Sequence, residues 1–165
     1  MFTSYSAELY PALSAASVSI PQIVLSLVVL AALTAISVVD IRKRRIPDLL
    51  NLALLVCGVA ALWIVPSADI VSRLIGLFCV SVPLFIFAVA VKHSFGMGDV
   101  KLMAAAGFLL GWQHVLTAFA IGTILGGVYG AVMLILRKKS RTDSFAFGPC
   151  LAAGIFAALI ESLIT

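Results

Sequence analysis

Six apolar runs, separated by short polar or basic segments, limit this chain to very few folds. An α-helix rises about 1.5 Å per residue, so about 20 apolar residues cross a hydrocarbon core about 30 Å thick. Of the 165 residues, 63% are hydrophobic and only 11% are charged, which is too little charge to cover a surface that faces water. We therefore predict an all-α, polytopic membrane protein with about six transmembrane helices. The expected spans are residues 20–39, 49–65, 70–91, 100–112, 115–136 and 147–164.

These runs are expected to form one structural unit. No soluble linker, repeat or low-complexity stretch separates them, so residues 1–165 are predicted to be a single integral membrane domain. Residues 1–19 contain no Lys or Arg, whereas a cleaved signal peptide has a basic segment before its apolar core. We expect them to be an external N-terminal segment, followed by a first helix that stays in the membrane.

The basic residues predict the orientation. They follow the first expected helix, flank the connection between the third and the fourth, and follow the fifth. With six crossings ten of the eleven lie on one side, with only Arg73 near the other, and cytoplasmic loops are the ones rich in Lys and Arg. We therefore expect both termini outside and the basic loops in the cytoplasm, and no nucleic-acid partner for the net charge of +4. These residues are Arg42, Lys43, Arg44, Arg45, Lys92, Lys101, Arg137, Lys138, Lys139 and Arg141.

The fourth run, residues 100–112, is shorter than a standard span and could instead form a re-entrant hairpin. A hairpin would place the last basic cluster outside, against the bias of the other loops. A full crossing is therefore favoured, with the helix beginning below the surface or the bilayer locally thinner.

Two acidic residues stand at the ends of apolar runs. Asp40 ends the first run and Asp99 opens the fourth, and the predicted topology puts both at the cytoplasmic boundary. A charged group at membrane depth costs about 2.5–3.5 kcal/mol on insertion scales, so it usually has a function or a partner. Two carboxylates in a poorly solvated site can share one proton, so that one activates a water while the other protonates a peptide carbonyl. We predict that Asp40 and Asp99 are the catalytic pair of an aspartic protease.

The segment before Asp99 and the histidines fit this chemistry. Gly96 and Gly98 lack a Cβ, so they are expected to allow unusual backbone angles and the close approach of an extended substrate. Aspartic catalysis needs no metal, and we expect no cofactor and no metal site. The sequence has only His93 and His114, expected on opposite sides of the membrane, and no HExxH motif.

The same residues also have structural interpretations. Asp99 could serve only as a helix N-cap, Asp40 could pair with Arg44, and Lys101 could be an anchor at the membrane surface. A proton- or ion-coupled carrier and a structural membrane subunit are the alternative functions. A carrier should place its polar groups near the bilayer midplane, whereas these aspartates lie at one edge. Close helix packing is predicted for the small residues Gly122, Gly126, Gly127 and Gly130.

Three motifs resemble those of the type IV prepilin peptidases, a family of GxGD intramembrane aspartic proteases. Residues 40–47, Asp-Ile-Arg-Lys-Arg-Arg-Ile-Pro, look like the family's first catalytic Asp, a basic turn and the Ile-Pro that begins the next helix. Residues 95–101 match the F-G-x-G-D-x-K signature around the second catalytic Asp. Residues 147–152 resemble a late F-G-P-x-L-A element.

The resemblance implies residue roles. Catalysis falls to Asp40 and Asp99, and support of the second aspartate falls to neighbours in its motif. Asp48 stands where many relatives have Asn, a departure that complicates the identification of the carboxylates. The supporting residues are Gly96, Gly98 and Lys101, with a looser implication that Pro149 and Leu151 shape the site.

The resemblance also implies an activity. It is that of a prepilin leader peptidase in the bacterial inner membrane, which cuts the short basic leader of prepilins or pseudopilins after a Gly at the cytoplasmic face. The expected partners are the apolar helix of the substrate, the lipid bilayer and a pilus assembly system. Longer relatives have an N-terminal segment with paired CxxC motifs and also N-methylate the product. This sequence shows no such segment, so we expect the short, peptidase-only form associated with Flp, or tight-adherence, pili.

Overall fold

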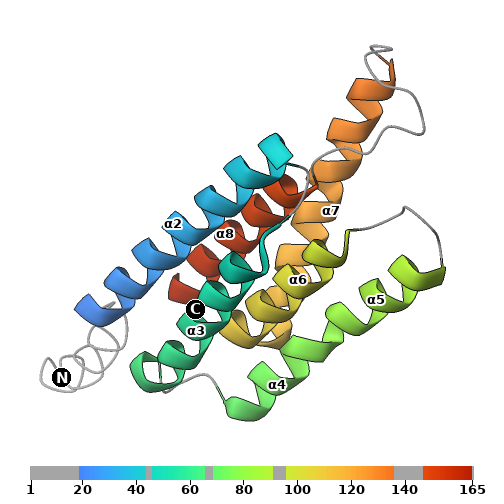
Figure 1. Ribbon diagram of the computed structural model, residues 1–165. Helices are drawn as coiled ribbons and strands as arrows, with labels where there is room; N and C mark the ends of the chain where they lie inside the picture. The colour runs from blue at the N-terminus through green and yellow to red at the C-terminus, as the bar shows by residue number, and fades with distance from the viewer. Residues whose placement is uncertain (1–18, 44–45, 66–68, 91–95, 136–146, 165) are drawn as a thin grey trace, which may run out of the picture.

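The computed structural model describes residues 19–43, 46–65, 69–90, 96–135 and 147–164, and within them every regular element is a helix (Figure 1). The prediction of an all-α fold is therefore confirmed. Most of the predicted external segment, and the basic residues at 44–45, 92 and 137–141, lie outside the described residues. The helices are α2 (Ile20–Lys43), α3 (Asp48–Ile64), α4 (Ile70–Cys79), α5 (Ser81–Ala90), α6 (Met97–Leu110), α7 (Trp112–Ile135) and α8 (Gly148–Ile164).

The helices lie where the apolar runs predicted them, and the first difference concerns Trp112. This residue begins α7 instead of ending α6. The cause is Gly111, whose φ of 84° is a left-handed backbone conformation that ends a helix and that glycine adopts at little cost. The amide of Gly111 still donates a hydrogen bond to the carbonyl of Gly107, at 2.9 Å.

The second difference is a break in the third run, between α4 and α5. Pro83 explains its position, because the proline ring cannot donate a hydrogen bond and would collide with the carbonyl of Cys79 four residues earlier. The hydroxyl of Ser81, the first residue after the break, donates to the carbonyl of Leu77 on the other side of it. The two helices together form one apolar span, Ile70–Ala90.

The lengths of the helices and their apolar outer surface both indicate a polytopic membrane protein. Three helical units, Ile20–Lys43, Ile70–Ala90 and Trp112–Met133, are long and apolar enough to span a membrane. The shorter apolar helices α3 and α8 have 17 residues each, and α6 has 14. Large apolar side chains cover the outer surface, such as Phe85 and Phe87 at 47% and 53% exposed, as lipid-facing helices require. The sidedness of the loops and termini stays a prediction.

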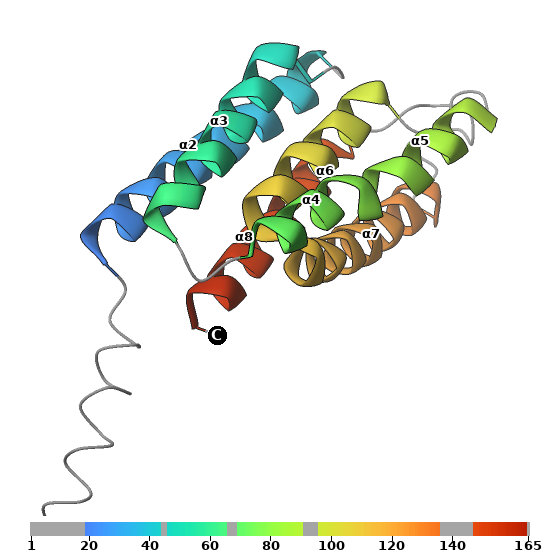
Figure 2. The same ribbon diagram turned by 90° about the horizontal axis from the view of Figure 1, so that it is seen from below.

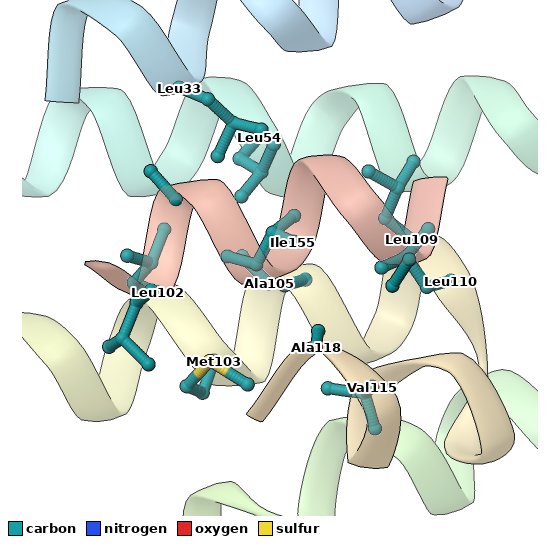
Figure 3. Close-up of a cluster of buried hydrophobic side chains, with 14 of the residues drawn as sticks. Leu33, Leu54, Leu102, Met103, Ala105, Leu109, Leu110, Val115, Ala118 and Ile155 are labelled. Carbon is teal, nitrogen blue, oxygen red and sulfur yellow. The ribbon is translucent and has the colours of Figure 1, made fainter. Parts of the chain in front are cut away.

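The short helix α6 lies at the centre of the bundle. It packs against α3, α4, α5, α7 and α8 (Figure 2), and most of its side chains are buried. Its length is about 21 Å at about 1.5 Å per residue, and its neighbours rather than lipid surround it. Figure 3 shows the apolar core that it shares with the adjacent helices, including Leu102 and Met103 of α6, Leu54 of α3 and Ile155 of α8.

Glycines let several of these helices touch through their backbones. A Cβ on Gly107 of α6 would overlap the carbonyl of Gly76 in α4, and one on Gly154 of α8 would overlap the carbonyl of Ala118 in α7. The packing predicted for the glycines of α7 is confirmed for two of the four and wrong for the others. Gly122 and Gly126 pack closely against Leu151 and Phe147, whereas Gly127 and Gly130 have no atom of the described residues within 4 Å of a built Cβ.

A buried arginine ties two helices together at the end of the bundle where α4 begins. Arg73 is only 1% exposed, and its guanidinium donates to carbonyls late in α3 and in the last turn of α6. A positive charge near helix C-termini is favourable because the carbonyl ends carry partial negative charge. The acceptors are Gly58 at 3.4 Å, Ala61 at 3.4 Å and Leu109 at 3.1 Å.

Candidate active site

The opposite end of the bundle gathers the last turn of α2 and the first turns of α3, α6 and α8 (Figures 1 and 2). Asp40 lies in the last turn of α2 and is 6% exposed, and Asp99 lies in the first turn of α6 and is 8% exposed. The two carboxylates lie close enough for the charge of Asp40 to act on Asp99. The structure thus brings together the two residues that the sequence analysis selected from distant segments.

Asp40 is held by the beginning of α8. The backbone N–H of Gly148 donates to Oδ2 of Asp40 at 2.9 Å, and this hydrogen bond is buried. Free N–H groups at a helix N-terminus, together with the helix dipole, favour an anion there. The next residue, Pro149, has no N–H to leave unpaired in this first turn. The alternative partner considered for Asp40, Arg44, lies outside the described residues.

A side chain at position 148 would displace Asp40. A Cβ there would lie 2.7 Å from Oδ2, 3.0 Å from Cγ and 3.2 Å from Cβ of Asp40, all closer than ordinary contacts. The sequence analysis named the motif that contains Gly148 but selected Pro149 and Leu151 from it. The available signal was a glycine at the second residue of the expected helix 147–164, where its lack of a side chain lets another group reach a free amide of the first turn.

Asp99 is held by the turn that opens α6. Its backbone N–H donates to the carbonyl of Gly96 at 3.0 Å, and its carboxylate accepts a hydrogen bond from the backbone N–H of Gly96. The N-cap is Gly96, so the interpretation of Asp99 as the N-cap residue is wrong. Asp99 instead occupies the third helical position, from which an acidic side chain reaches back to the cap.

Gly96 and Gly98 do not show the predicted unusual backbone angles. Gly96 is extended, with φ of −72° and ψ of 139°, and Gly98 is helical. At Gly98 the requirement is space, because a Cβ would lie 2.9 Å from Cβ of Ile46 in the segment before α3. A built Cβ on Gly96 would lie 3.4 Å from Oδ2 of Asp99, at the edge of ordinary contact.

Lys101 reaches α3 rather than Asp99. Its Nζ lies 2.8 Å from Oδ1 of Asp48, and the two side chains are 51% and 74% exposed. This ion pair joins the first turn of α6 to the first turn of α3. The structure shows no hydrogen bond or ion pair from Lys101 to Asp99 in the described part of the chain. Asp48 itself is exposed, unlike the buried pair Asp40 and Asp99.

Asn51 lies at the same end of the bundle as the two aspartates, and the sequence analysis missed it. It lies in α3, is 6% exposed, and its Nδ2 is 3.5 Å from the carbonyl oxygen of Gly98. Its Oδ1 is buried without a hydrogen-bond partner among the described residues. An amide side chain inside the apolar run of residues 49–65 was the signal that could have identified it.

These features define a class of protein, a helical membrane protein with two interacting, buried carboxylates at one end of its bundle. A profile of the Type IV leader peptidase family matches residues 27–131, a range that contains both Asp40 and Asp99. The chain belongs to the type IV leader peptidase family.

Relatives with established names agree with this assignment, and each is called prepilin leader peptidase/N-methyltransferase. The protein of Escherichia coli strain K12 is 35% identical over 126 residues, which cover 72% of this chain and 55% of the relative. That of Pectobacterium carotovorum subsp. carotovorum is 31% identical over 134 residues, covering 78% and 48%. That of Bacillus subtilis strain 168 is 28% identical over 142 residues, covering 85% and 57%. The chain spans about half the length of the relatives that it matches. No solved structure matches it significantly.

Proposed function

We propose that this chain is a prepilin leader peptidase of the aspartic type, with Asp40 and Asp99 as its catalytic pair. The observation that carries the proposal is the meeting of these two buried carboxylates, from α2 and α6, at one end of the bundle. Family membership supports a leader peptidase, and the relatives' name supports a prepilin as the substrate.

The two carboxylates can perform hydrolysis without a metal. An interacting, poorly solvated pair holds one proton between its members. The ionised carboxylate takes a proton from a water, and the resulting hydroxide attacks the carbonyl carbon while the protonated carboxylate gives its proton to the carbonyl oxygen. The carboxylate that took the proton from water then gives it to the leaving nitrogen, the other carboxylate takes a proton back from a hydroxyl of the tetrahedral intermediate, and the C–N bond breaks. The amides of Gly148 and Gly96 hold the two carboxylates in position.

The place of the pair suits a prepilin. The proposed substrate has a short basic leader, a Gly before the scissile bond and an apolar helix that lies in the bilayer. A site at one end of a membrane bundle can meet the junction between leader and helix, and the basic-loop bias supports the cytoplasmic face of a bacterial inner membrane for that end. The cleaved product would pass to a pilus assembly system. An Flp pilus as that system stays a prediction from the resemblance.

A carrier is disfavoured by the same geometry. Coupled transporters place their ion and substrate sites near the bilayer midplane, often where helices are broken. The one break among the described helices, at Val80, is not at the aspartates. Both aspartates instead lie in first or last turns of helices. A purely structural subunit would not require two mutually repelling carboxylates to be buried together, since this arrangement costs free energy.

The test is leader cleavage in cells that co-express the chain with a small protein carrying a basic leader, a Gly and an apolar helix. Asp40→Asn and Asp99→Asn should each reduce cleavage at least about 10²-fold, the usual contribution of a general acid or base. The matched control is Asp69→Asn at the other end of the bundle, because Asn is as good an N-cap for α4 as Asp. Normal cleavage by either of the first two variants would refute the proposed pair.

A further inference from the structure

Asn51 is a buried polar side chain that the mechanism above does not use. It lies in the first turns of α3, in a stretch that is otherwise apolar, and only 6% of it is exposed. Burying an amide is unfavourable unless it is hydrogen-bonded, so a side chain of this kind needs a physical reason in a membrane bundle.

The hydrogen bonding of Asn51 is incomplete. Its Nδ2 donates toward the carbonyl of Gly98 at 3.5 Å, the long limit for such a bond. Its Oδ1 is buried with no partner in the described part of the chain. An unpaired buried acceptor lowers stability, whereas the same acceptor becomes favourable when a ligand supplies the donor.

The position of Asn51 indicates what kind of ligand could supply the donor that its Oδ1 lacks. Gly98 is bonded directly to Asp99, so the Asn51 amide lies beside the turn that carries the second aspartate. The exposed ion pair Asp48–Lys101, at 2.8 Å, is a second contact between the beginnings of α3 and α6. Because Asn51 is only 6% exposed and its Nδ2 lies 3.5 Å from the carbonyl oxygen of Gly98, its side chain is already in place before any ligand arrives, which reduces the entropic cost of binding.

We propose that Asn51 is a substrate-binding residue whose Oδ1 accepts a hydrogen bond from a backbone N–H of the extended peptide next to the scissile bond. The inference rests on the proposed function and adds a contact to it. A peptide drawn into a water-poor site loses the water that paired its N–H groups, so it gains from an acceptor in the wall. Such a contact recognises the peptide backbone and not a side chain, so leaders of different sequence can bind in the same way.

The experiment is a double-mutant cycle with purified full-length protein in detergent and a synthetic leader-Gly-helix peptide. One arm replaces Asn51 by Leu, which has a similar volume and no acceptor. The other arm replaces single peptide amides near the scissile bond by esters, which removes one N–H at a time. We expect Asn51→Leu to raise KM about five- to tenfold with kcat within about threefold, the effect of one neutral hydrogen bond. One ester should weaken binding to the wild type by a similar factor and have no further effect on the variant.

Several results would overturn the inference. If every ester acts equally on wild type and variant, Asn51 does not bind a peptide N–H. A fall in kcat with KM unchanged would make Asn51 a positioning residue that acts on Asp99 through Gly98. If Asn51→Leu does not fold, judged by thermal unfolding, Asn51→Ser takes its place, because the shorter hydroxyl cannot reach the same N–H.

The same peptide separates this inference from the proposed function. Binding of the uncleaved peptide to an Asp40→Asn background, followed by fluorescence anisotropy, needs no catalysis. Tighter binding with Asn51 than with Leu at this position supports the contact, even if the wild type fails to cleave and the proposed catalysis is wrong. Binding that does not depend on Asn51, or no binding at all, overturns the contact.

Discussion

Replacing Gly148 by Ala should displace Asp40 and leave the rest of the bundle intact. The added methyl carbon would lie 2.7 Å from Oδ2 and 3.0 Å from Cγ of Asp40. Carbon atoms in ordinary contact lie about 3.5–4.0 Å apart, so the carboxylate has to move by roughly 0.5–1 Å. The hydrogen bond from the Gly148 amide, now 2.9 Å, then exceeds the useful range.

Two estimates of the effect on the reaction agree. A misplacement of about 1 Å in a catalytic group can lower the rate about 10²-fold. Loss of a hydrogen bond to a charged group costs about 1.5–3 kcal/mol, which is about 10- to 150-fold at about 1.4 kcal/mol per factor of ten. We therefore expect Gly148→Ala to lower kcat for leader cleavage roughly 10²-fold, with KM nearly unchanged because the peptide contacts remain.

The measurement is the initial rate of leader cleavage by the purified protein in detergent, with thermal unfolding to show that the variant is folded. Gly127→Ala and Gly130→Ala are matched controls, because a Cβ at either position of α7 meets none of the described part of the chain within 4 Å. These controls should cleave at the wild-type rate and gain up to about 0.5–1 kcal/mol of stability from the better helix former. Wild-type activity in Gly148→Ala, or an equal loss in the controls, would refute the reasoning.

Two further predictions concern charged residues outside the pair. Asp48→Asn should cleave within about threefold of the wild-type rate, because its exposed ion pair with Lys101 is worth at most about 1 kcal/mol; a loss as large as that of Asp99→Asn would make Asp48 a catalytic carboxylate. Arg73→Leu should lower the free energy of unfolding by about 2–4 kcal/mol, because its three buried hydrogen bonds to backbone carbonyls are lost, although Ala61 keeps the amide of Val65 as a donor. Thermal unfolding in detergent checks this effect, and an unchanged melting temperature would contradict it.

Much of the fold could be predicted from the sequence because apolar length decides what crosses a bilayer. The helices begin and end close to the predicted positions, and the motifs around Asp40 and Asp99 pointed to residues that do meet. The break between α4 and α5 could also have been read from Pro83. The all-α class needed no knowledge of contacts, since only helices satisfy their own backbone hydrogen bonds in lipid.

The contacts between helices could not be predicted in the same way. Helix α6 is apolar on every side, so its pattern does not show which face meets α3 or α4. The hydrogen bond from Gly148 to Asp40 depends on how far α8 is shifted along α2, and no local pattern sets that shift. For the same reason the partners of Arg73 and the neighbour of Asn51 became clear only from the packed bundle.

The contacts of the site also imply an order in which its parts come together. The amide that steadies Asp40 belongs to the first residue of α8, the last of the described helices to leave the ribosome. A growing chain that has inserted α2 and α6 carries both acids but lacks this anchor. In the proposed peptidase, the hydrogen bond that holds Asp40 therefore forms only after α8 has been made and has packed beside α2.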